Sequence, residues 1–153
     1  MKIKEVTVKD LTEICDLEKK VFKEDAFSKE LIKKLIQRNI FFLKLVKSGL
    51  KKNIIGFVII VKDRKDRANI INFLIDPEYQ NKGFGSTLLN YVIEKIKKLK
   101  EIKKIILNVK SKNSLAIKLY EKFNFNKVQK IDNYYRSKES AYLMEKDIED
   151  KNT

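Results

Sequence analysis

Three apolar runs follow one another in the middle of this chain and constrain its fold more than any other feature. They span residues 40–46, 54–61 and 68–75 and are separated only by short polar segments. Runs of this length, rich in Ile, Val and Phe and bounded by polar residues, are typical of buried strands. Residues 48–53 between the first two runs have the composition of a hairpin turn. The sequence therefore predicts three neighbouring antiparallel strands.

Further strand patterns lie on either side of these runs. A first strand is predicted over 3–8, a buried strand over 104–109, and two closing strands over 127–135 and 141–148. Asp76-Pro77 ends the third central strand, because proline has no amide to donate to a neighbouring strand.

Four helices are predicted between the strands. The first begins after Asp10, with Glu13 as its capping-box partner and Cys15 on its inward face. The second begins at Ser28, and its inward residues are Leu31, Ile32, Leu35 and Ile36. The others cover 84–99 and 111–123. The resulting order, βααβββαβαββ, predicts a single-domain α/β fold with a central mixed, mostly antiparallel sheet and helices on both faces.

Composition excludes several classes of protein. The chain has 153 residues, one cysteine and no histidine. An internal disulfide, a Ser-His-Asp triad, a Cys-His dyad and most zinc sites are therefore excluded, and no metal is expected. No apolar run approaches the roughly 18 residues of a membrane span, and residues 1–13 contain no signal-peptide core. We therefore expect a cytoplasmic protein with no membrane partner.

The formal net charge of +14 raises the question of a nucleic-acid partner. Clustered lysines bind phosphate backbones by releasing counterions. In this chain the lysines are spread over nearly every segment, as on ordinary solvated helix faces. We therefore do not expect nucleic acid as the partner, and a smaller anionic ligand fits the charge as well.

A glycine pair marks a candidate site for such a ligand. Gly83 and Gly85 lie between a strand end and a predicted helix start. Free backbone amides at a helix N-terminus bind phosphate, and Lys82 adds a positive charge. An ordinary glycine turn is the alternative. Ser86-Thr87 does not complete a Walker loop, and Leu88 stands where a dinucleotide fingerprint needs a small residue.

The same segment resembles a known family. Residues 80–85, QNKGFG, are similar to the Gln/Arg-x-x-Gly-x-Gly/Ala motif of the Gcn5-related N-acetyltransferases (GNAT). Three blocks, FLIDPEYQNKGFGSTLL, LNVKSKNSLAIKLYEKFNF and NYYRSKESAYLMEKDI, resemble in order the subgroup that acetylates protein N-termini, which includes ribosomal-protein alanine and archaeal enzymes. The resemblance covers residues 1–148 as one GNAT-fold acetyltransferase domain and leaves 149–153 as a polar tail.

The resemblance implies a binding site for acetyl-coenzyme A. Backbone amides of Gln80 to Gly85 would hold the pyrophosphate, and the strand end at Phe73 to Ile75 would pair with the pantetheine arm and offer an amide to the oxyanion. Asn113 would contact the coenzyme arm, cap its helix, or do both. The residues assigned to the coenzyme are Phe73, Leu74, Ile75, Gln80, Asn81, Lys82, Gly83, Phe84, Gly85, Ser86, Asn113 and Tyr120.

The resemblance also implies catalytic and acceptor residues. Tyr120 matches the general acid near the coenzyme sulfur, with a half-buried helix tyrosine as the alternative. Asn108 stands where bacterial relatives have a glutamate base, and Glu24 or its neighbour Asp25 is the candidate to replace that base. The residues expected to line the acceptor site are Phe27, Tyr134 and Tyr135, with strand packing as the alternative for the tyrosines.

An amide at position 108 favours one acceptor. At neutral pH roughly a tenth of α-amines are neutral, against less than about a thousandth of lysine side chains. The sequence therefore predicts acetyl transfer to the N-terminal α-amine of a protein or peptide, with ribosomal proteins among the candidates. The alternatives are a small-molecule amine, a lysine side chain, or a non-catalytic module that binds RNA or the coenzyme. No oligomeric state is predicted.

Overall fold

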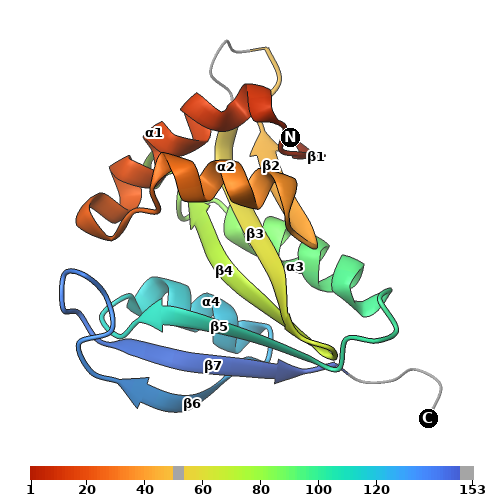
Figure 1. The fold of residues 1–153 in the computed structure, drawn as a ribbon, viewed down its shortest axis with the longest axis vertical. Coiled ribbons are helices and arrows are strands. Elements are labelled where there is room, and N and C mark those ends of the chain that lie inside the picture. The colour runs from red at the N-terminus through yellow and green to blue at the C-terminus, as the bar shows by residue number, and fades with distance from the viewer. Residues whose placement is uncertain (50–53, 149–153) are drawn as a thin grey trace.

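The described part of the chain forms one seven-stranded sheet in the order β1-β2-β3-β4-β5-β7-β6 (Figure 1). This computed structural model describes residues 1–49 and 54–148, so most of the predicted turn at 48–53 and the whole tail at 149–153 lie outside the described residues. The strands are β1 (Lys2–Glu5), β2 (Phe41–Val46), β3 (Ile54–Arg64), β4 (Arg67–Ile75), β5 (Lys104–Lys110), β6 (Asn126–Ile131) and β7 (Ala141–Asp147). The three central strands β2, β3 and β4 are antiparallel neighbours, as the sequence predicts.

Four α-helices of the described residues cover the sheet. They are α1 (Leu11–Phe22), α2 (Lys29–Gln37), α3 (Phe84–Lys97) and α4 (Ser114–Lys122). In Figure 1, α1 and α2 lie in front of the sheet, and α3 lies behind it. The predicted order βααβββαβαββ and the mixed α/β fold are confirmed.

Each face of the sheet has its own hydrophobic core. On one face α1 and α2 bury residues such as Ile14, Cys15 and Ile32 against Phe57. On the other face α3 and α4 pack against β4, β5 and β7, with Phe125 among the fully buried side chains. Cys15 is a core residue, as expected from its place on the inward face of its helix.

Some local predictions at the helix starts are wrong. Ser28 does cap α2 through a hydrogen bond from the Leu31 amide, but the Leu31 side chain is exposed. Asp10 and Glu13 do not form a capping box. Instead the Asp10 carboxylate accepts from the Thr7 amide and pairs with Lys44, and the Glu13 carboxylate accepts from the Ile54 amide. Asp10 thus keeps a local partner, Thr7, beside the distant Lys44, and only Glu13 has a tertiary partner in place of a local one.

The predicted strand over 127–135 is too long. Strand β6 ends at Ile131, and Asn133 has a positive φ of 52° that breaks the extended backbone. Tyr134 and Tyr135 therefore lie in the loop between β6 and β7. The predicted first strand also extends too far, because Val8–Asp10 forms a 3₁₀ turn.

The two strands at the centre of the sheet, β4 and β5, pair over only part of their length. Their parallel ladder runs from the pair Arg67 and Lys104 to the pair Ile70 and Leu107, and then it stops. A bulge follows at once on β4, where Ile70 and Asn72 oppose consecutive residues of β3. The strands therefore diverge toward their C-terminal ends, as the ribbons of β4 and β5 do in Figure 1.

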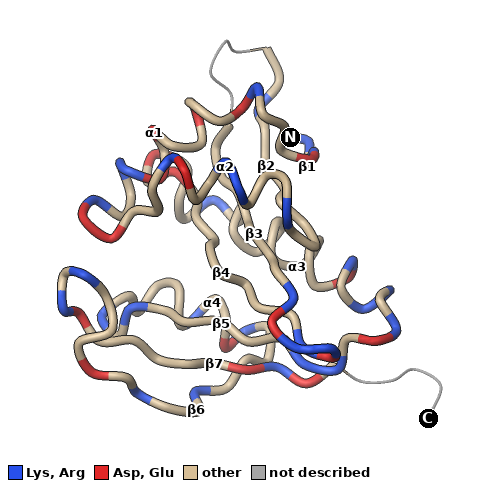
Figure 2. Tube along the Cα trace, in the orientation of Figure 1, with Lys and Arg blue, Asp and Glu red and all other residues tan. Residues whose placement is uncertain are grey.

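The positive charge does not gather on one face of the described chain. Lys and Arg follow nearly every element in Figure 2, and around the β3–β4 hairpin they alternate with Asp and Glu. This is the pattern of solvated surfaces and gives no single basic patch. Within residues 1–49 and 54–148, no helix is long and apolar enough to cross a membrane.

Candidate active site

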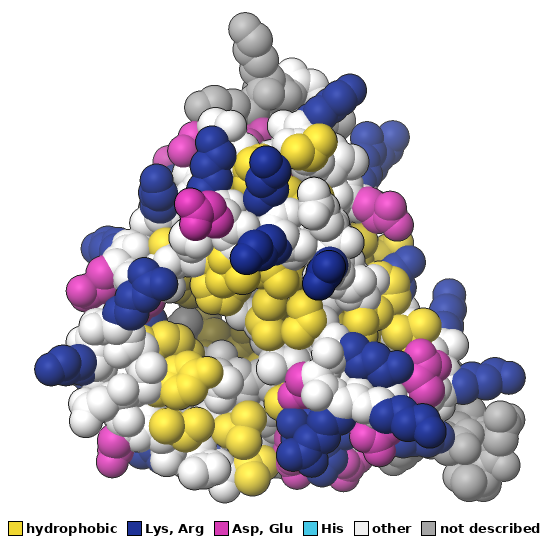
Figure 3. Space-filling model, viewed as in Figure 1, with side chains coloured by type: hydrophobic (Ala, Val, Ile, Leu, Met, Phe, Trp, Pro, Cys, Tyr) yellow, Lys and Arg dark blue, Asp and Glu magenta, His cyan; other side chains and the backbone are white. Residues whose placement is uncertain are grey.

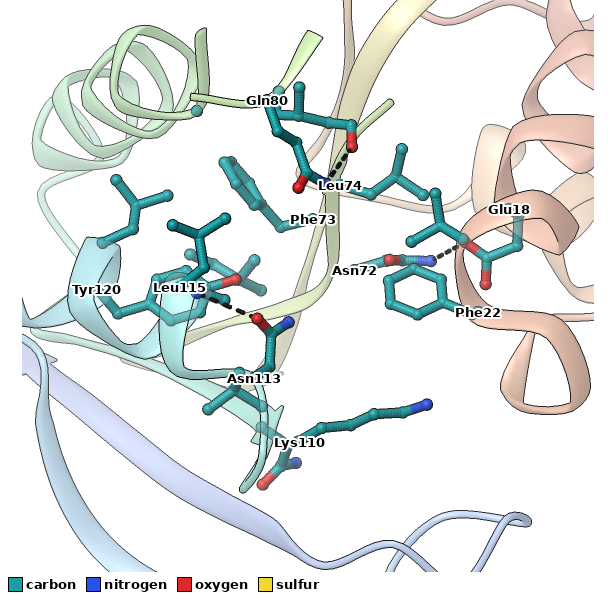
Figure 4. Close-up of a pocket in the computed structure, with 18 of the residues that line it drawn as sticks. Glu18, Phe22, Asn72, Phe73, Leu74, Gln80, Lys110, Asn113, Leu115 and Tyr120 are labelled. Carbon is teal, nitrogen blue, oxygen red and sulfur yellow. Dashed lines mark hydrogen bonds between the residues drawn. The ribbon is translucent and has the colours of Figure 1, made fainter. Parts of the chain in front are cut away.

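A cavity of about 320 Å³ occupies the opening between β4 and β5. Its walls come from α1 and the segment after it, the C-terminal half of β4, the loop at 80–86, the end of β5, and α4. Figure 3 shows the molecule hollowed between its upper and lower halves, with hydrophobic side chains around the opening. Figure 4 shows the lining residues projecting into this space from both diverging strands.

Strand β4 presents unpaired backbone groups to the cavity. The amide of Asp76 donates to Ile55 of β3, and strand amides alternate in direction, so those of Phe73 and Ile75 point away from β3 and toward the opening. The Gln80 side chain donates to the Ile75 carbonyl, at 3.0 Å, on this same side (Figure 4). The described structure thus provides the free strand edge that the sequence predicts for binding a coenzyme arm.

The loop before α3 adds a cradle of backbone amides. Asn81 and Gly83 both have left-handed backbone conformations, with φ of 62° and 86°. Among the described residues no side chain caps α3 at Gly83, and no acidic residue lies in its first turn, so the first amides of this helix are available to an anion. The Lys122 ammonium lies 3.4 Å from the Ser86 hydroxyl and adds positive charge beside this turn.

The second glycine of the motif has a packing role. A side chain at Gly85 would place its Cβ only 3.2 Å from Leu119 of α4, whereas a Cβ at Gly83 would meet no atom of the described residues within 4 Å. Gly85 therefore lets α3 and α4 approach each other, and Gly83 supplies the left-handed turn. The two glycines have different functions in the motif.

Tyr120 lies on the buried side of α4 and lines the cavity. Its ring packs edge-on against Phe73, with centroids 6.0 Å apart, and against Phe125. Burial raises the pKa of Tyr120, and the nearby Tyr135 raises it further. The hydroxyl is therefore protonated at neutral pH.

Asn108 projects from β5 into the cavity and is bonded at only one end of its amide. Its Nδ2 donates to the Tyr134 hydroxyl at 3.1 Å. Its Oδ1 is buried and has no hydrogen-bond partner among the described residues. A buried carbonyl oxygen without a donor is unusual, and it marks a place where a ligand donor fits.

A buried carboxyl group lines the same side of the cavity. Glu18 of α1 is 1% exposed, accepts from the Phe27 amide at 2.8 Å, and accepts from the Asn72 side chain at 2.6 Å (Figure 4). Burial raises the pKa of Glu18 despite these two bonds. Glu18 thus holds the segment of Phe27 against β4.

Four residues form an ion cluster at the mouth of the cavity, which we call the Asp25 cluster: Asp25, Lys110, Ser137 and Glu139. The Lys110 ammonium lies 2.7 Å from Asp25 and 3.0 Å from Glu139. Ser137 donates to Asp25 through its amide and its hydroxyl. Burial opposes ionisation of Asp25, but these donors outweigh burial and lower its pKa to about 2.

Most of the predicted site residues meet at this cavity. Those that line it are Phe27, Phe73, Leu74, Ile75, Gln80, Asn81, Gly83, Gly85, Ser86, Asn108, Asn113, Tyr120 and Tyr135. Asn113 also caps α4 through a bond from the Ala116 amide. Four predicted residues are absent from the lining: Glu24, Lys82, Phe84 and Tyr134. Glu24 is exposed on the 3₁₀ turn Lys23–Asp25, and Tyr134 reaches the site only through its hydroxyl.

Sequence reasoning missed Glu18, Phe22, Asn72 and Lys110, which all line the cavity. One signal for Glu18 was present, because it follows Ile14 by four residues and therefore shares the buried face of its helix. No local pattern marks Lys110, since its partners lie in distant segments of the chain.

Comparison with known proteins agrees with this geometry. The family described as Acetyltransferase (GNAT) family matches residues 9–125, so the chain belongs to the GNAT family. Among relatives, an N-alpha-acetyltransferase of Saccharolobus solfataricus is 37% identical over 78 residues, which cover 51% of this chain and 47% of that protein. The [ribosomal protein bS18]-alanine N-acetyltransferase of Escherichia coli is 35% identical over 82 residues, which cover 52% and 55%. The matches thus span about half the length of these curated relatives.

Solved structures match nearly the whole chain. The E. coli ribosomal-protein-S18-alanine N-acetyltransferase superposes with a TM-score of 0.83 at 26% identity and covers 99% of this chain and 97% of its own. Ard1 from Thermoplasma volcanium gives a TM-score of 0.86 at 22% identity, with 97% and 98% covered, and this likeness establishes the fold alone.

Proposed function

We propose that this protein transfers an acetyl group from acetyl-coenzyme A to the N-terminal α-amine of a protein. The observation that carries the proposal is the buried Oδ1 of Asn108, which lacks a donor among the described residues and lies in a cavity shared with Tyr120 and Tyr135. A neutral amine has hydrogens to donate and a lone pair with which to attack. The names of the relatives from S. solfataricus and E. coli support an α-amine acceptor.

The residues of the cavity fit the coenzyme. The cradle of Asn81, Gly83 and the first turn of α3 would hold its phosphates, with Lys122 nearby. The free edge of β4 at Phe73 and Ile75 would bind the amide-containing arm. The bound coenzyme supplies the acetyl group as a thioester.

Position 108 carries an amide and no carboxylate that could remove a proton from the amine. The acceptor is the fraction of α-amine that is already neutral, roughly a tenth near pH 7. Asn108 Oδ1 accepts a hydrogen from this amine and orients its lone pair, while Tyr134 fixes the Asn108 side chain. The amide of Phe73 stabilises negative charge on the carbonyl oxygen. After attack, the nitrogen releases its extra proton to water through the open cavity mouth.

Tyr120 completes the chemistry on the other side of the cavity. Its hydroxyl is protonated at neutral pH and donates its proton to the sulfur as the thiolate leaves. Tyr120 lies against Phe73, so the acid and the amide that holds the oxyanion share one wall.

Mass spectrometry of acetylated peptides tests this function. The probe is a library of octapeptides with a free α-amine, one internal lysine and each of the twenty amino acids at the first position. We expect acetylation of the α-amine, with loss of activity when the α-amine is blocked and no loss when the lysine is replaced by arginine. Continued acetylation of α-blocked peptides would refute the proposal.

A further inference from the structure

The Asp25 cluster joins three distant segments at the mouth of the cavity. Asp25 belongs to the segment between α1 and α2, Lys110 ends β5, and Ser137 and Glu139 lie in the loop between β6 and β7. In Figure 1 the first and last of these segments approach each other on the open side of the sheet, beyond the point where β4 and β5 cease to pair. Among the described residues, no strand ladder connects β4 with β5 in that region. The side-chain contacts of the Asp25 cluster therefore make the connection between the two parts of the sheet.

Each member of the cluster is close in the chain to a predicted acceptor residue or to the predicted catalytic residue Asn108. Asp25 precedes Phe27 by two residues, and Lys110 follows Asn108 by two. The backbone carbonyl of Glu139 accepts the amides of both Tyr134 and Tyr135. The Lys110 ammonium also lies 5.5 Å from the centre of the Tyr135 ring. The cluster therefore joins the segments that carry all of these residues.

We propose that the Asp25 cluster is the positioning device of the acceptor site. It holds the α1–α2 segment against the β6–β7 loop, so that Phe27, Asn108 and the tyrosine pair form one surface for the acceptor. This inference rests on the proposed acetyl transfer. The cluster residues act through their neighbours and take no part in bond making.

The burial of the cluster gives it a single arrangement. The Asp25 side chain is 3% exposed, and that of Lys110 is 22% exposed. Removing Lys110 leaves the buried Asp25 carboxylate without its cation, and removing Asp25 leaves Lys110 with Glu139 alone, so either change weakens the contact between the two segments. Coupled buried polar groups also strengthen one another. A loose surface pair would tolerate the loss without rearrangement.

The backbone next to Asp25 is held under strain. Lys23 has a φ of 51° and a ψ of −118°, a conformation that residues with a Cβ rarely adopt. Such a conformation persists only when surrounding contacts fix the chain on both sides. On one side α1 is packed into its core, and on the other the contacts are those of Asp25 and Phe27.

The location of the cluster separates the acceptor from the coenzyme. None of its four residues lies in the β4 edge, the 80–83 loop or the first turn of α3. Loosening the cluster should therefore weaken acceptor binding and leave coenzyme binding intact. This separation distinguishes a positioning role from a general contribution to folding, which would affect both ligands.

The test compares Asp25→Asn and Lys110→Met with a matched control. Asp63→Asn also removes a carboxylate from an ion pair, with Arg67 at 2.8 Å, but at the opposite end of β4. For each protein we would measure kcat and KM with the octapeptide that the wild type acetylates fastest, coenzyme A affinity by calorimetry, and hydrogen exchange of residues 132–140.

We expect both cluster variants to raise the peptide KM by about tenfold or more and to change the Kd for coenzyme A by less than about twofold. Hydrogen exchange of the backbone amides of residues 132–140 should become faster. The double variant should resemble the worse single variant, because the two side chains act together. Lys110→Arg keeps the positive charge, so its peptide KM should equal that of the wild type. Asp63→Asn should change none of the measured quantities.

Two results would overturn the inference. One is an unchanged peptide KM and unchanged exchange in folded Asp25→Asn and Lys110→Met proteins. The other is a loss of coenzyme affinity as large as the rise in peptide KM. Failure of the proposed function is seen separately, in the wild type alone, as the absence of acetylation of every unblocked peptide.

Discussion

The Asn108 amide nitrogen donates to the Tyr134 hydroxyl, and this bond orients the opposite end of the amide, Oδ1, as a buried acceptor without a donor among the described residues. This position of β5 thus carries a fixed neutral acceptor. Such a group orients an amine but does not take its proton. The chemistry of this site therefore depends on the protonation state in which the acceptor arrives.

Asn108→Ala should lower kcat/KM for an unblocked peptide by about tenfold, the effect of losing one hydrogen bond. Asn108→Asp keeps an acceptor oxygen and should retain more activity. It should also raise the rate on the acid side of the α-amine pKa, where neutral amine is scarce. The measurement is kcat/KM against pH for the wild type and the two variants. Equal pH profiles for Asn108→Asp and the wild type would contradict a role in amine binding.

Tyr120→Phe should lower kcat by about a hundredfold, in the range of lost acid catalysis, with unchanged affinity for coenzyme A. Since burial raises the pKa of Tyr120, the wild-type kcat should show no loss of a tyrosine proton as pH rises through the ordinary tyrosine range. Tyr91→Phe, on the exposed side of α3, is the matched control. Turnover by Tyr120→Phe at the wild-type rate would exclude Tyr120 as the acid.

Gly83 substitutions should separate backbone conformation from side-chain bulk. Asn tolerates the left-handed region and Val does not, so Gly83→Asn should retain coenzyme A affinity while Gly83→Val weakens it by about tenfold or more. Calorimetry on the folded variants measures both. Equal affinity for Gly83→Val and wild type would remove the 80–83 loop from the phosphate site.

Lys23→Gly should stabilise the protein. The backbone at Lys23 is in a region that glycine occupies without strain, so the substitution should raise the free energy of unfolding by about 1 kcal/mol. Urea unfolding measures this change, and the neighbouring Lys19→Gly, inside α1, is the control that should destabilise. A destabilised Lys23→Gly protein would show that the strain is absent.

Acid should release the Asp25 cluster at an unusually low pH. The pKa of Asp25 is about 2 in the folded protein, below its ordinary 3.8, so its stabilising contribution is fully present above about pH 4. This contribution to the free energy of unfolding is lost as pH falls toward 2, because Asp25 then binds a proton in the folded protein as it already does in the unfolded chain. Asp25→Asn should remove this part of the pH dependence of unfolding, while Asp63→Asn retains it. Parallel curves for Asp25→Asn and wild type between pH 4 and 2 would contradict the assignment.

The sequence predicted the order of elements and the cavity lining around Gly83 and Gly85 better than the side of the cavity that we assign to the acceptor. Periodicity predicts strands and helices. Gly83 and Gly85 lie in one short motif, where residues that are close in the chain are also close in space. The acceptor side instead depends on contacts such as that of Ser137 with Asp25, 112 positions apart, which no local pattern encodes. For the same reason Tyr134 and Tyr135 were predicted in a strand, whereas the left-handed backbone at Asn133 turns the chain away.

The early end of the β4–β5 ladder gives this sheet an edge in its interior. An edge at the border of a sheet can pair with any extended chain and invites aggregation. Here the edge at Phe73 and Ile75 instead faces a cavity between β4 and β5. A slender molecule with amide groups at strand-like spacing fits this edge, so the sheet can be extended by a ligand rather than by another chain.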